Sequence, residues 1–117
     1  MPIAEGDPGW NRARARLLDT AEVAVREANR AVLHEAIPEL SEAAFLRLAV
    51  SVARVRADYL AAALALGRDS QGHPTRAEIE SLALKRIAFD EASQAFEALS
   101  RAISRGYIDI SVGAAAE

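Results

Sequence analysis

The sequence predicts an all-α fold: three long helices in an antiparallel up-down-up bundle, which dimerises into a larger helical bundle. Apolar residues recur at three- and four-residue steps along most of the chain, as they do in amphipathic helices. Segments rich in Pro, Gly and polar residues interrupt this pattern near residues 37–40 and 67–74. The chain has 117 residues, of which 51% are apolar and 26% charged, so we expect 1–117 to form a single domain with its own core.

The first helix is expected at residues 8–36, after a loose N-terminal arm at 1–7. Asp7 is a suitable N-cap, and proline is favoured at the first helical position, which Pro8 would occupy. Pro38 lies just beyond the expected end. The main apolar stripe follows helical spacing and consists of Trp10, Leu17, Ala21, Ala24, Val25, Ala28 and Val32.

The second helix is expected at residues 41–66, with Ser41 as its cap and Gly67 as its C-terminal stop. Because the linker before it is short, the first two helices should be antiparallel neighbours. Arg54 and Asp58 line up on one narrow polar stripe, and such charges would be costly inside a bilayer. A membrane span is therefore disfavoured for this apolar segment.

The apolar arc of the second helix covers roughly two-thirds of its circumference, which is wider than a three-helix bundle needs. We therefore expect a second copy of the chain to cover part of it, together with part of the third helix. The residues expected at this interface are Phe45, Val52, Leu60, Leu84 and Ile87.

The third helix is expected at residues 75–105, because Thr75 and Glu78 have the spacing of a capping box and Gly106 provides a stop. A seven-residue repeat runs along it and predicts packing against other helices; it consists of Leu82, Phe89, Phe96 and Ile103. The tail at 106–117 begins with alternating apolar and polar residues, which is typical of a short extended segment.

Arg56 interrupts the apolar arc of the second helix, and a buried charge must be paired or hydrogen-bonded. An antiparallel pairing with the third helix would bring it near Tyr59, Glu78 and Lys85. In one interpretation the basic side chains extend to water or pair with a carboxylate. In the other, the four residues form a small anion site between helices.

The sequence contains no convincing motif for disulfide, metal or nucleic-acid chemistry. The chain has no cysteine, so disulfides and thiolate metal sites are excluded. Ala31 precedes His34 where a di-metal helical bundle would need glutamate. A net charge of −3 does not favour nucleic-acid binding, and the N-terminus does not resemble a signal peptide. We therefore expect no metal, no cofactor, no nucleic-acid or membrane partner, and a cytoplasmic location.

These observations favour a non-catalytic cytoplasmic helical-bundle module for homo-oligomerisation, most simply a homodimer, and for protein–protein interaction. The surplus apolar surface of the second helix is the positive observation behind this hypothesis. The alternative is a helical-bundle enzyme or sensor that binds a small anionic metabolite at Arg56, Tyr59, Glu78 and Lys85.

Overall fold

The computed structural model describes residues 7–113, and it confirms that the chain is mostly helical with three long helices. The ends at 1–6 and 114–117, where the sequence predicts loose segments, lie outside the described residues. Two short strands accompany the helices. In chain order the elements are α1 (Pro8–Ala36), β1 (Leu40–Ser41), α2 (Glu42–Asp69), α3 (Arg76–Ser104) and β2 (Ile110–Ser111).

Each helix begins at a polar cap that the sequence predicts. The Asp7 carboxylate accepts a hydrogen bond from the Gly9 N–H at 2.9 Å, and the Ser41 hydroxyl accepts one from the Ala44 N–H at 3.0 Å. The capping box of α3 is complete, because Thr75 and Glu78 each accept from the other's backbone N–H. These bonds satisfy backbone donors that the first helical turn leaves without intrahelical partners.

The C-terminal end of α2 differs from the prediction. The helix continues through Gly67 and ends at Asp69. The left-handed backbone that reverses the chain occurs later, at Gln71 with φ 52° and Gly72 with φ 84°. Gly67 was the wrong stop because a glycine ends a helix only where the chain adopts the left-handed conformation.

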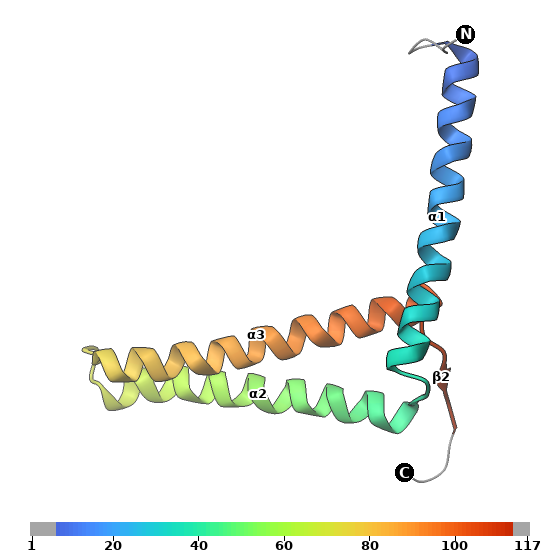
Figure 1. Cartoon of the computed structure of the whole chain (residues 1–117). Helices are drawn as coiled ribbons and strands as arrows, with labels where there is room; N and C mark the ends of the chain where they lie inside the picture. Colours follow the sequence, from blue (N-terminus) through green and yellow to red (C-terminus); the bar gives the residue numbers. More distant parts are fainter. Residues whose placement is uncertain (1–6, 114–117) are drawn as a thin grey trace.

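α2 and α3 lie side by side and are joined at one end by a turn, forming a hairpin (Figure 1). Aromatic side chains fill the space between them. Phe45 stacks on Phe96 with ring centroids 5.0 Å apart, and Tyr59 stacks on Phe89 at 6.2 Å. Val52 is the buried residue of α2, with 8% of its surface exposed. The hairpin therefore has a narrow core of its own.

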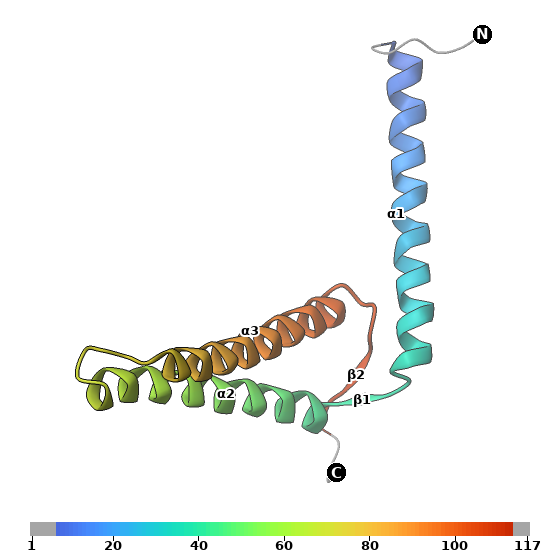
Figure 2. The ribbon, with the colours of Figure 1, turned by 60° about the vertical axis from the view of Figure 1, so that its left-hand side comes forward.

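α1 projects away from the hairpin, so the molecule has the shape of an L (Figures 1 and 2). Its radius of gyration is 23.0 Å, whereas a compact domain of this length has about 13 Å. α1 has no buried residue. The predicted three-helix bundle is therefore not formed within one chain, because α1 leaves the corner in a direction that keeps it from packing along α2 and α3.

The corner of the L is held by the two strands. β1 and β2 pair in parallel, with Leu40 opposite Ile110 and Ser41 opposite Ser111. Leu40 in β1 and Ile108, two residues before β2, are both buried. β2 lies in the tail segment that the sequence predicts as extended. The tail thus fastens the base of α1 to the start of α2.

Candidate functional site

The exposed side of α2 carries an apolar row that the hairpin does not use. Helical geometry places this row about 120° around the helix from the side that contacts α3. Leu64 is 75% exposed, and its large apolar neighbours on the row are exposed as well. The row has the spacing of a coiled-coil seam and consists of Leu46, Val50, Ala53, Ala57, Leu60 and Leu64.

The five residues expected at a dimer interface are divided between the interior and the surface. Phe45 and Val52 contact α3 of the same chain or lie buried beside it, so they belong to the hairpin core. Leu60 is exposed on the α2 row, while Leu84 and Ile87 are exposed on α3. An interface at these last three residues stays a prediction.

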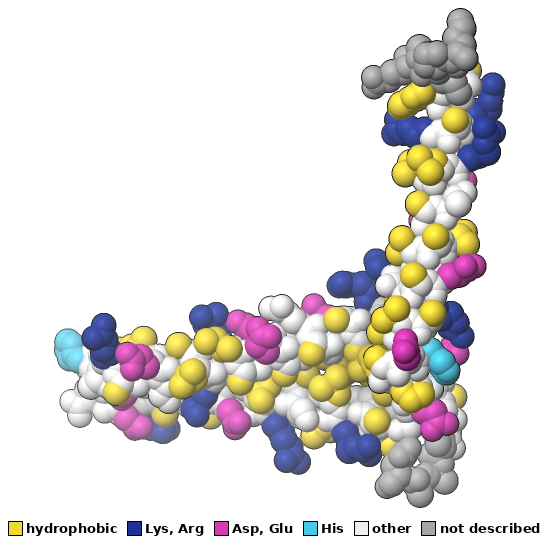
Figure 3. Space-filling view, in the orientation of Figure 1, with side chains coloured by type: hydrophobic (Ala, Val, Ile, Leu, Met, Phe, Trp, Pro, Cys, Tyr) yellow, Lys and Arg dark blue, Asp and Glu magenta, His cyan; other side chains and the backbone are white. Residues whose placement is uncertain are grey.

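The apolar stripe of α1 is exposed from Leu17 to Val32. Figure 3 shows apolar side chains following α1 from its N-terminal end to the corner. Leu17, Val25 and Val32 on the stripe are all more than half exposed. A solvent-facing stripe this long is unusual, because amphipathic helices normally turn their apolar face toward a core.

Two of the four residues of the predicted anion site, Arg56 and Tyr59, contact the same aromatic ring. The Arg56 guanidinium lies 5.1 Å from the centroid of the Phe89 ring, where it makes a cation–π contact and stays exposed. Tyr59 stacks on the same ring. The Glu78 carboxylate accepts from the Thr75 N–H in the capping box, and Lys85 is exposed. Arg56 thus extends along an aromatic surface toward water, as the first interpretation of this residue expected.

The corner contains a charged contact that the sequence analysis missed. Arg30 of α1 donates to both carboxylate oxygens of Asp109, at 2.6 and 3.3 Å, and to the Gly106 carbonyl oxygen. These hydrogen bonds, followed by the charge of Arg30, lower the pKa of Asp109, while Asp109 raises the pKa of Arg30. Residues so far apart in the chain carry no local sequence signal of pairing, so only the fold reveals this contact.

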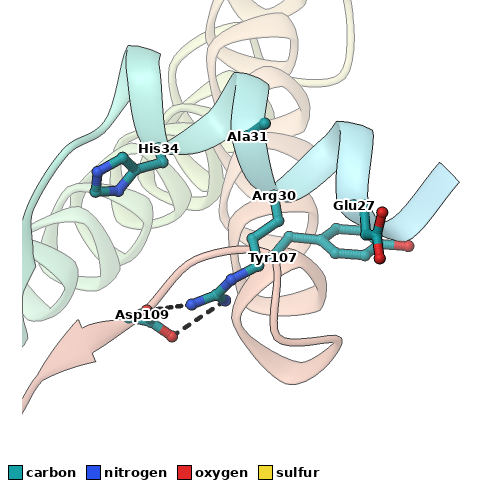
Figure 4. Close-up of a pocket in the computed structure, with 6 residues that line it drawn as sticks. All are labelled: Glu27, Arg30, Ala31, His34, Tyr107 and Asp109. Atoms are coloured by element: carbon teal, nitrogen blue, oxygen red, sulfur yellow. Dashed lines mark hydrogen bonds and ion pairs between the residues drawn. The ribbon is translucent and has the colours of Figure 1, made fainter. Parts of the chain in front are cut away.

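Arg30 and Asp109 line a cavity of about 440 Å³ between α1 and the segment after α3 (Figure 4). Its other walls are Glu27, Ala31, His34 and Tyr107. Arg30 and Asp109 neutralise each other, and Glu27 is the remaining charged carboxylate in the lining. Within 7–113 there is no group of three His, Asp or Glu residues placed to hold a metal ion. The geometry favours a structural role for this corner.

Comparisons of the chain with protein-family models, curated proteins and solved structures give no match. None of the described helices is both long enough and apolar enough to cross a bilayer. The exposed surfaces of α1, α2 and α3 are therefore the features of the molecule that bear on its function.

Proposed function

We propose that the chain is a non-catalytic module for homo-oligomerisation and protein–protein interaction. The observation that carries this proposal is the amount of exposed surface. The chain has 8904 Å² of accessible surface, whereas a compact monomer of its mass has about 6,200 Å². Stable obligate dimers bury about 1,000–2,500 Å² per chain, so the excess is on the scale of one such interface.

The composition of this surface supports association with a protein. Soluble monomers rarely expose long contiguous apolar patches, and such patches mark interaction sites. Here apolar rows run along α2 and α1, and Leu84 with 68% exposure adds to the surface of α3. Packing a second hairpin against the α2 row would form a four-helix unit.

A cytoplasmic setting fits this proposal, because a chain without cysteine needs no oxidising compartment to fold. The alternative, a metabolite-binding enzyme or sensor, has no observation in its favour, since Glu78 is engaged in the α3 cap and the basic residues lie at the surface.

Sedimentation equilibrium on the full chain at micromolar concentration tests the proposal. A dimer or larger species is expected. Leu60→Arg should weaken any assembly that uses the α2 row, while Ser51→Arg adds the same charge on the polar stripe of α2 and serves as the matched control. A strictly monomeric chain that binds no protein partner would contradict the proposal.

A further inference from the structure

The stripe on α1 is not packed against any other part of residues 7–113. Isolated helices gain little stability in water, and most helical stability in proteins comes from packing an amphipathic face. α1 has 29 residues, and none of them is buried. A segment from another chain could therefore stabilise α1 by covering its stripe.

The corner leaves the stripe accessible to such a chain. Arg30, which binds Asp109 and Gly106, lies on the side of α1 opposite Ala28 and its neighbours on the stripe. Tyr107 lines two hollows along α1, one beside Arg30 and one that extends from Arg26 to Ala21 and Val25 at the edge of the stripe. The contacts at the corner thus hold the polar side of α1, and Ala21 and Val25 remain exposed beside the second hollow.

Charged residues at the two ends of the stripe specify a direction of pairing. Arg14 lies on the stripe near the start of α1, with its guanidinium 5.4 Å from the Trp10 ring centroid. Glu35 lies on the stripe near the end of the helix. The midpoint between these two residues falls between Ala24 and Val25. An antiparallel copy of α1 centred there would place Arg14 beside Glu35 at both ends, whereas a parallel copy would bring like charges together.

The apolar residues are complementary in the same antiparallel register. The pairs it brings opposite each other are Leu17 with Val32, Leu18 with Ala31, Ala21 with Ala28, and Ala24 with Val25. Large side chains therefore meet small or β-branched ones, and the alanine pairs allow the two backbones to approach closely. Such self-complementarity is what a two-fold interface requires.

We propose that α1 pairs antiparallel with α1 of a second copy, centred between Ala24 and Val25, with reciprocal Arg14–Glu35 ion pairs. This inference rests on the proposed homo-oligomerising function and names the surface that performs it. The two hairpins then extend from opposite ends of a shared helix pair, which leaves the α2 row accessible for a further chain.

Charge reversal tests the register, with the dimer dissociation constant measured by sedimentation. Arg14→Glu and Glu35→Arg each replace two attractive contacts by two repulsive ones, so each variant should weaken self-association by about tenfold. An equimolar mixture should form a heterodimer with near wild-type affinity, because each mixed pair regains opposite charges. Arg16→Glu makes the same reversal away from the stripe and should leave the dissociation constant unchanged.

Val25→Asp tests the centre of the stripe. It should abolish the dimer while circular dichroism still reports the helices of the hairpin, and Val23→Asp, on the far side of α1, should not change the dimer. Equal effects of Val25→Asp and Val23→Asp, or no heterodimer in the charge mixture, would overturn the inference. If Leu60→Arg alone dissociates the dimer, the proposed function stands and this inference fails; a monomeric wild type contradicts both.

Discussion

The α2–α3 hairpin and helix α1 have the same amphipathic kind of sequence but different surroundings. α2 and α3 have 28 and 29 residues and cover part of each other's apolar surface, with stacked rings such as Phe45 and Phe96 between them. α1 has 29 residues and a comparable apolar stripe, yet no residue of α1 is buried. The difference shows that the apolar periodicity of a sequence predicts which face of a helix will be packed. It does not predict whether that face packs against the same chain or another one.

The largest expected effect is a loss of stability in the hairpin core, which α1 does not share. Val52→Asp would place a charge without a partner between α2 and α3, where Val52 is buried. We expect it to lower the free energy of unfolding by at least about 3 kcal/mol. Urea unfolding followed by circular dichroism measures this loss. A stability within error of wild type would show that the two helices do not depend on each other.

Dilution should affect the hairpin and α1 differently. The hairpin has an internal core, so its helicity should not depend on protein concentration. In the proposed dimer α1 is stabilised by a second copy, so part of its helicity should be lost below the dimer dissociation constant. Hydrogen exchange at two concentrations reports on each helix separately. If the protection of α1 from hydrogen exchange does not depend on concentration, α1 is stable by itself.

The smallest expected effect concerns the corner that joins the two regions. Arg30 lowers the pKa of Asp109 in the folded chain. The pair therefore contributes its stability above the ordinary aspartate pKa, and this contribution is lost as the pH falls through the lowered value, below about pH 4. Dye labels on α1 and α3 should report a looser corner in acid. In the Asp109→Asn variant the corner should already be loose at neutral pH and should not loosen further in acid. An equal acid response in this variant would show that other groups cause the change.

The local features of the fold were predictable because they depend on neighbouring residues. Asp7, Ser41 and the Thr75–Glu78 box mark the starts of the helices, since caps act within one turn. Gly67 misled the prediction of the α2 end, because the residue type alone does not show where the backbone turns left-handed.

The features of the fold that the sequence does not predict depend on contacts between residues far apart in the chain. Arg30 and Asp109 meet only because β1 pairs with β2 and brings the tail to the base of α1. A level pairing of α2 and α3 was expected to bring Arg56 near Lys85, and the structure shows that its guanidinium lies over the Phe89 ring. The arrangement of α1 likewise depends on the corner, which no periodicity encodes.

Disulfide cross-linking at single introduced cysteines tests the antiparallel pairing of α1 most directly, since the chain has no cysteine of its own. In the proposed register Ala24→Cys lies near the two-fold axis, whereas the two Leu17→Cys residues are separated by about 20 Å along the helix pair. We predict that oxidation cross-links the Ala24→Cys chain to itself and that the Leu17→Cys chain cross-links only when mixed with Val32→Cys. Self-cross-linking at both positions would indicate parallel helices, and no cross-link at either would contradict a shared α1 pair.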